Sequence, residues 1–210
     1  MRDEAYFVLP ESGSPGPGVL LLCSQWGLTP ALRQRADRLS EAGLTVLAPD
    51  LTFGARPYTV EDVEEMLADL DVDRLASLVL GSAGLLAEKS SGDGIGVVGL
   101  GMGGSMGLWL SVRNAPLVDA VVSFYGSQQI DFAGADARYS LHLAETDRWV
   151  SEDDIAFMEA TMGLEGLEVS STVHQGTSHG FAEPEDPNFD VVTAEKAWAA
   201  TTDFLVETLK

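Results

Sequence analysis

The sequence predicts a three-layer α/β domain, in which helices cover both faces of a mostly parallel sheet. Two observations predict it: short apolar runs of strand length recur along the chain, and longer segments with helix-start signals separate them. This alternation is typical of a parallel sheet. No internal repeat, low-complexity tract or long linker interrupts it. We therefore expect one α/β domain over residues 1–210.

The first half of the chain begins with two apolar strands joined by a helix. Residues Gly18–Ser24 form a short continuous apolar run, as a buried parallel strand should. Thr29–Pro30 then supplies a helix cap followed by proline at the first helical position, and Gly43 ends that helix. A second buried strand is expected over Leu44–Ala48.

Two later helices begin with capping boxes. Thr59 and Asp62 have the spacing of a capping box, and so do Ser151 and Asp154. They predict helices over 60–70 and 155–162. The other predicted elements are helices over 72–88, after residue 101 and over 193–209, a turn at 90–94, and strands over 95–100, 120–125, 139–143 and 167–173.

The composition bounds the function classes. The formal net charge of −21 argues against nucleic acid or an anionic membrane as a partner, because both bind basic surfaces. Cys23 is the single cysteine, so no internal disulfide is possible, and no Cys/His cluster has metal-site spacing. No apolar run is long enough for a membrane span, and the first ten residues do not resemble a signal peptide. We expect a cytoplasmic protein without metal or cofactor, whose partner is a small-molecule substrate or ligand.

The residues that follow the predicted strands are the candidate functional residues. In a parallel sheet, ligands bind at the carboxyl ends of the strands. A glycine-rich turn, an acid (Asp147) and a histidine (His179) follow successive strands in that order. This is the chain order of nucleophile, acid and histidine in α/β-hydrolases.

At these same stretches the sequence resembles the dienelactone hydrolase family of α/β-hydrolases, over about residues 18–209. The resemblance implies an α/β-hydrolase fold, with Asp147 as catalytic acid and His179 as catalytic histidine. It also implies an oxyanion hole made by the backbone N–H groups of Gln25 and Met102. The stretches that carry the resemblance are SQWGLTP, VLAPDL, VVGLGMGGSMGLWL, SFYG, AETD and TSHGFAEP.

The glycine-rich turn departs from the family pattern at its central position. Family members read Gly-x-Cys-x-Gly-Gly, and wider relatives have serine in place of cysteine. Here Gly99, Gly103 and Gly104 match, and the nucleophile falls on Gly101. Glycine has no side chain to attack with, but it relieves the strained positive-φ conformation of such a turn.

Further departures concern the substrate. The family glutamate of the earlier loop corresponds to Ser24, and the family arginine after the histidine corresponds to Glu183. The predicted helix over 60–70 contains no arginine either. A dienelactone carboxylate is therefore expected to meet a negative surface.

Two other interpretations of the glycine run are open. Ser105 also stands in a Gly-x-Ser-x-Gly pattern, but the glycines before it make a poor strand. We expect it one helical turn beyond position 101, pointing into the structure as a small packing residue. The GxGxxG spacing fits a dinucleotide fingerprint, but no acidic residue ends the next strand.

Ser24, Cys23 and Ser178 are alternative nucleophiles, although Cys23 is better interpreted as a buried strand residue. His142 and His174 lie within predicted strands and are expected to be structural.

Ser24, Trp26, Phe53 and Phe181 are expected to line an apolar pocket. Two functions follow from the sequence. One is a hydrolase of an ester, lactone or thioester, impaired or non-covalent because of Gly101. The other is a non-catalytic relative that binds a small molecule or a partner through the former active-site pocket.

Overall fold

A single seven-stranded sheet forms the centre of the molecule. The computed structural model describes residues 5–209, so the predicted domain ends at 1 and 210 lie outside the described residues. The strand order is β1-β3-β2-β4-β5-β6-β7, and β1 alone among these strands runs antiparallel to its neighbour. The strands are β1 (Ala5–Val8), β2 (Pro17–Leu22), β3 (Thr45–Pro49), β4 (Ser91–Leu100), β5 (Val118–Phe124), β6 (Arg138–Thr146) and β7 (Val169–Ser178).

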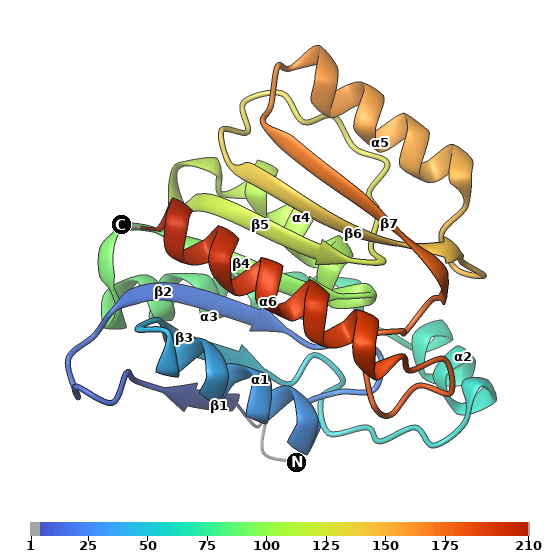
Figure 1. The fold of residues 1–210 in the computed structure, drawn as a ribbon, viewed down its shortest axis with the longest axis horizontal. Coiled ribbons are helices and arrows are strands. Elements are labelled where there is room, and N and C mark those ends of the chain that lie inside the picture. Colours follow the sequence, from blue (N-terminus) through green and yellow to red (C-terminus); the bar gives the residue numbers. More distant parts are fainter. Residues whose placement is uncertain (1–4, 210) are drawn as a thin grey trace.

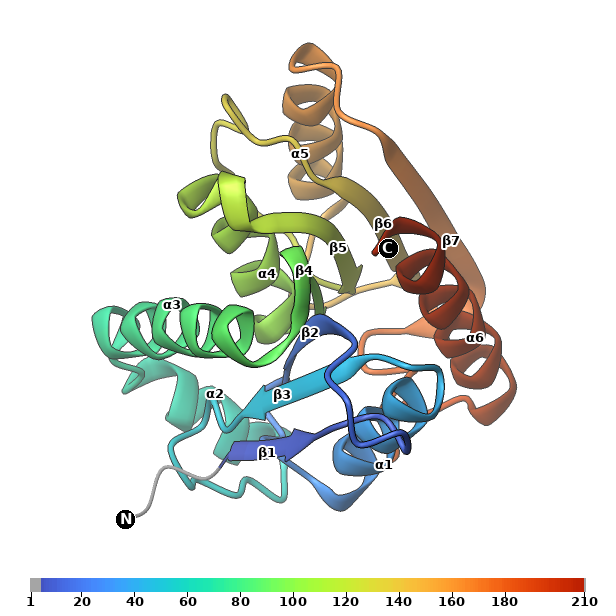
Figure 2. The same cartoon turned by 90° about the vertical axis from the view of Figure 1, so that its left-hand side faces the viewer.

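Helices cover both faces of the sheet, which confirms the predicted three-layer arrangement. Two of them, α1 and α6, lie on one face, and α3, α4 and α5 lie on the other (Figures 1 and 2). The helices are α1 (Pro30–Glu41), α2 (Val60–Ala68), α3 (Val72–Lys89), α4 (Met102–Arg113), α5 (Glu152–Leu164) and α6 (Val191–Thr208), with a short 3₁₀ turn at Ala115–Leu117. None of these helices is both long and apolar enough to cross a bilayer.

The predicted helix starts are confirmed by their caps. The Thr29 hydroxyl accepts a hydrogen bond from the Leu32 amide at 3.1 Å, and Pro30 is the first helical residue. Both capping boxes are formed, at Thr59 before α2 and at Ser151 before α5. Each box satisfies backbone N–H groups that a helix start otherwise leaves without a partner.

Some strand boundaries differ from the prediction. β4 begins at Ser91, inside the predicted turn, and its first three residues are exposed. β7 extends five residues beyond the predicted end at Val173, as far as Ser178. β1 was not predicted, because a four-residue edge strand with half-exposed side chains has little apolar signal.

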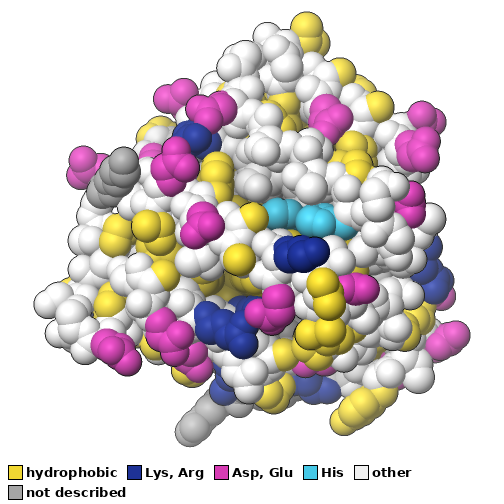
Figure 3. Space-filling model, in the orientation of Figure 1, with side chains coloured by type: hydrophobic (Ala, Val, Ile, Leu, Met, Phe, Trp, Pro, Cys, Tyr) yellow, Lys and Arg dark blue, Asp and Glu magenta, His cyan; other side chains and the backbone are white. Residues whose placement is uncertain are grey.

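The surface carries the excess of acidic residues. Acidic side chains are spread over the face shown in Figure 3, with basic side chains between them. The carboxyl ends of the parallel strands meet at one edge of the sheet, and α2 lies beside that edge (Figure 1). This edge carries the candidate site.

Candidate active site

The glycine-rich turn joins β4 to α4 at Gly101. β4 ends at Leu100, α4 begins at Met102, and Gly101 between them has φ +49° and ψ −114°. A second glycine allows close packing, because a Cβ at Gly103 would lie 2.3 Å from the Leu22 carbonyl oxygen. The strand therefore turns sharply at Gly101, and Ser105 lies one helical turn further on.

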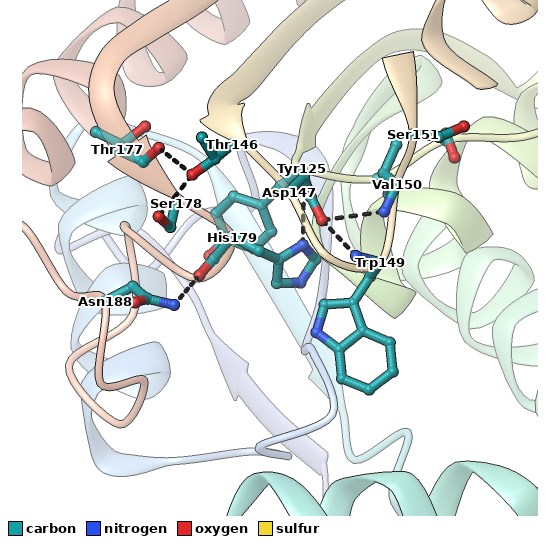
Figure 4. A network of polar contacts seen from close by, with 12 residues as sticks. Tyr125, Thr146, Asp147, Trp149, Val150, Ser151, Thr177, Ser178, His179 and Asn188 are labelled. Atoms are coloured by element: carbon teal, nitrogen blue, oxygen red, sulfur yellow. Dashed lines mark hydrogen bonds and ion pairs between the residues drawn. The ribbon is translucent and has the colours of Figure 1, made fainter. Parts of the chain in front are cut away.

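Asp147 and His179 form a hydrogen-bonded pair. Asp147 directly follows β6 and His179 directly follows β7. Asp147 Oδ2 lies 2.8 Å from His179 Nδ1, and Oδ1 accepts hydrogen bonds from the amides of Trp149 (2.8 Å) and Val150 (3.0 Å) (Figure 4). With its Nδ1–H donated to Asp147, the neutral imidazole keeps a lone pair on Nε2 and can accept a proton there.

The histidine is held from several sides. Its amide donates to the Thr146 carbonyl at 3.2 Å, and its carbonyl accepts from Asn188 Nδ2 at 2.9 Å. Its ring packs against Tyr125, with 4.7 Å between the ring centroids. His179 is only 5% exposed, so the imidazole orientation is fixed by its surroundings.

Three loops bring their residues together at Gly101. A Cβ built on Gly101 would lie 3.4 Å from His179 Nε2, 2.9 Å from Gln25 Oε1 and 3.7 Å from Ser24 Cβ. A cavity of about 170 Å³ opens at this point. Its lining residues are Gln25, Leu67, Gly101, Met102, Ser105, Tyr125, Ser127, Trp149, Val150 and His179.

Backbone donors are available beside Gly101. Met102 is the first residue of α4, and first-turn amides have no intrahelical acceptor. The positive end of the α4 dipole adds to their attraction for an anion. Gln25 lies in the loop after β2 and lines the same cavity, and its part in an oxyanion hole stays a prediction.

Glu183 lies inside the protein rather than on the negative surface that the sequence predicted. Its two carboxyl oxygens accept hydrogen bonds from the Ser24 hydroxyl at 2.5 Å and from the Tyr125 hydroxyl at 2.9 Å. Burial, opposed in part by these two hydrogen bonds, raises the pKa of Glu183 to about 8. The sequence could not reveal this, because the burial depends on how the loop after β7 folds.

The residues predicted as pocket walls are placed behind the site. Ser24, Trp26 and Phe181 are all buried and do not line the cavity at Gly101. The indole N–H of Trp26 donates to Asp186 at 3.3 Å, and the Phe181 ring packs on Tyr125. Both side chains therefore belong to the core.

The observed walls come from other residues. Tyr125, Leu67 and Trp149 supply apolar surface at the cavity, and none was predicted to do so. Its position two residues after a catalytic-acid candidate was the available sequence signal for Trp149. Phe53 lies under the guanidinium of Arg74, which is 3.9 Å from its ring centroid.

Cys23 is inert as a nucleophile, and the hydroxyls of Ser24 and Ser178 are engaged in hydrogen bonds. Burial raises the pKa of the Cys23 thiol to about 12, so this residue stays protonated at neutral pH. Ser24 donates to Glu183, and the Ser178 hydroxyl is within 2.8 Å of the Thr146 hydroxyl. Ser105 lines the cavity at Gly101 instead of pointing into the structure, and its hydroxyl accepts from the Ser127 amide at 3.3 Å.

His142 and His174 form a separate pair within the sheet. Nδ1 of His142 lies 3.1 Å from Nε2 of His174, and the rings are stacked. Burial and the neighbouring His174 lower the pKa of His142 to about 4. His142 Nε2 also lies 3.3 Å from the Thr201 hydroxyl of α6, and the His174 ring packs on Phe181. Neither ring lines the Gly101 cavity, which supports the structural role that the sequence indicated.

A mostly parallel sheet with a strand–turn–helix elbow, and an acid–histidine pair at the neighbouring strand ends, defines an α/β-hydrolase fold. A sequence model described as "Dienelactone hydrolase family" matches residues 4–209. The chain therefore belongs to the dienelactone hydrolase family.

Individual proteins resemble the chain over nearly its whole length. Protein usf of Aquifex pyrophilus is 28% identical over 221 residues, which cover 100% of this chain and 95% of that protein. Carboxymethylenebutenolidase 1 of Cupriavidus pinatubonensis is 26% identical, over 97% of this chain and 91% of that protein. The structure of a dienelactone hydrolase-like promiscuous phosphotriesterase from metagenomic libraries superposes with a TM-score of 0.82 at 20% identity, covering 98% of this chain and 92% of that chain.

Proposed function

We propose that the protein hydrolyses a carboxylic ester, lactone or thioester with a water molecule that His179 activates, because Gly101 stands at the nucleophile position. One observation carries this proposal. The position of a Cβ on Gly101 lies 3.4 Å from His179 Nε2, while Nδ1 of the same ring is hydrogen-bonded to Asp147. A base that is oriented in this way can take a proton from a nucleophile at that position. Because Gly101 has no side chain, the nucleophile is a water molecule.

The reaction proceeds in two steps. The water oxygen attacks the carbonyl carbon and one water proton passes to His179 Nε2, while Asp147 stabilises the resulting imidazolium. The carbonyl oxygen becomes an oxyanion that the amides of Gln25 and Met102 bind. The intermediate then collapses, and the proton on Nε2 passes to the leaving alkoxide or thiolate. The products are a carboxylic acid and an alcohol or thiol.

The rate follows from the missing covalent step. Hydrolases that lose one member of a catalytic triad keep roughly 10³–10⁴-fold acceleration over water, from substrate binding and the oxyanion hole. We expect a slow enzyme of this kind. No acyl-enzyme forms in this mechanism, so product release should show no initial burst.

The acidic lining of a cavity beside Asp147 favours a neutral or cationic substrate. A cavity of about 550 Å³ lies beside Asp147, and its lining includes apolar residues such as Leu143 and Ile155. Its charged lining residues are all acidic: Glu145, Asp147, Glu152 and Glu159. A substrate carboxylate would be repelled there, whereas an uncharged acyl chain or an amine would not be.

The test is hydrolysis of short-chain p-nitrophenyl esters by the unmodified protein and by His179→Ala, Gly101→Ser and Gly101→Cys. We expect slow turnover without a burst in the unmodified protein, and its loss in His179→Ala. The Gly101 variants should gain a burst of p-nitrophenol, because a side-chain nucleophile can then be acylated. Turnover that survives His179→Ala would overturn the proposal.

The second candidate function is binding without turnover. The observation that favours it is again Gly101, which lacks a nucleophile in a site that is otherwise assembled. Under this alternative, an ester or its amide analogue would bind saturably and remain intact. Calorimetric titration with a non-hydrolysable amide, alongside the ester assay, separates the two functions.

A further inference from the structure

Gln25 is a buried polar side chain without a protein partner. The residue is 5% exposed, and its backbone follows β2. Among residues 5–209, no hydrogen-bond partner is found for either its carboxamide oxygen or its carboxamide nitrogen. The carboxamide is not among the enclosed unpaired side-chain atoms of the described residues, because it lines the cavity at Gly101, where water can reach it.

The carboxamide is aimed at the space left by the missing side chain. Its oxygen lies 2.9 Å from the Cβ position of Gly101, closer than real Cβ contacts normally come. Nε2 of His179 lies 3.4 Å from the same position. Two hydrogen-bond acceptors therefore converge on one point, where Gly101 itself contributes no side-chain atom.

We propose that Gln25 is a catalytic residue that holds the attacking water together with His179. This inference rests on the proposed hydrolase function. One water hydrogen is donated to the carboxamide oxygen of Gln25 and the other to Nε2 of His179. The bound water lies just beyond the Cβ position of Gly101, in the cavity that both residues line.

The arrangement accounts for every proton of the reaction. The hydrogen donated to His179 is the one transferred when the water oxygen bonds to the carbonyl carbon. The hydrogen donated to Gln25 stays on that oxygen and becomes the hydroxyl of the acid product. Fixing both hydrogens aims a water lone pair at the substrate, which lowers the entropic part of the barrier.

Gln25 then acts on both the attacking water and the substrate carbonyl. Its carboxamide oxygen orients the nucleophile, and its backbone N–H belongs to the oxyanion hole. Removal of the side chain alone should therefore change kcat and leave KM nearly unchanged, because the backbone donor and the cavity walls remain. A residue that only filled space would not lower kcat while leaving KM nearly unchanged.

The experiment compares Gln25→Met, Gln25→Glu and the control Gln34→Met, which replaces an exposed glutamine on α1. We expect kcat to fall about ten- to thirtyfold in Gln25→Met, the loss of one good hydrogen bond in the transition state. Gln25→Glu keeps an acceptor oxygen and should retain more of kcat than Gln25→Met. In Gly101→Ser, where the hydroxyl displaces the water, Gln25→Met should have a much smaller effect.

Several outcomes overturn the inference. An equal effect of Gln25→Met in both Gly101 backgrounds assigns Gln25 a structural role. Turnover that depends on His179 but not on Gln25 overturns the inference and leaves the proposed function standing. A crystal structure near 1.2 Å resolution tests the water site even if no ester is hydrolysed. An ordered water that is hydrogen-bonded to Gln25 Oε1 and His179 Nε2, and that is absent from Gln25→Met, supports the inference. The absence of this water from the unmodified protein overturns it.

Discussion

Gly101 combines backbone strain and chemistry in one residue. Its φ of +49° with ψ of −114° is a conformation that residues with a Cβ rarely adopt. A nucleophile in such a turn is strained, and glycine removes that strain together with the reactive atom. Glycine at this position also leaves space beside His179 and Gln25. In the proposed mechanism, the attacking water occupies this space.

The cost of a side chain at this turn can be measured directly. We expect Gly101→Ala to lower the free energy of unfolding by about 1–3 kcal/mol, because the positive φ opposes a Cβ, while the end of the Gln25 side chain can move aside. Gly84→Ala is the control, since Gly84 lies within α3 with open space around its Cβ position. It should raise stability by roughly 0.5–1 kcal/mol. Urea unfolding measures both, and equal effects at the two positions would contradict the strain argument.

Glu183 links the loop after β7 to the pH dependence of stability. Its pKa is raised from 4.5 to about 8 by burial, so between these values the folded protein holds a proton that the unfolded chain has released. The contribution of Glu183 to the free energy of unfolding should therefore be highest below pH 4.5. It should fall as the pH rises to about 8.

Glu183→Gln removes this titration. The stability of the unmodified protein relative to the variant should fall by up to about 4 kcal/mol across that pH range. Urea unfolding at a series of pH values measures the difference. Glu41→Gln, which changes an exposed carboxyl at the end of α1, should follow the unmodified protein. A constant difference between the Glu183 variant and the unmodified protein would show that Glu183 is ionised when folded.

At the scale of elements, local signals explain what the sequence could predict. The caps at Thr29, Thr59 and Ser151 act within one helical turn, so their residues suffice to identify them. The central strands β2 and β4 are apolar because both of their faces are covered. Edge strands lack that pattern: β1 was not predicted, and β7 was predicted to end at Val173, because only one of its last five residues is buried.

The site was predictable where it depends on chain order, and unpredictable where it depends on loop conformation. Asp147 and His179 were placed together because each follows a neighbouring parallel strand, a consequence of sheet topology. The burial of Glu183 and the direction of the Gln25 side chain depend on loops whose conformations no local pattern specifies. Both are long-range results of packing.

At the scale of the whole molecule, electrostatic repulsion is the dominant charge effect. The chain has 33 acidic residues and 12 basic ones. Surface ion pairs such as Arg148–Glu64 and Arg35–Glu195 use part of the basic set and contribute little individually. A net charge of −21 therefore opposes the compact state through self-repulsion.

Salt should relieve this repulsion. We expect the urea midpoint to rise with NaCl, steeply up to about 0.2 M and weakly above it, because the screening length falls from about 30 Å at 0.01 M to about 8 Å at 0.15 M. A double variant, Glu61→Gln with Glu65→Gln, removes two like charges one turn apart on the exposed side of α2. It should be more stable than the unmodified protein at low salt and should depend less on salt. A midpoint that fell with added salt would mean that ion pairs, rather than repulsion, dominate the electrostatics of the fold.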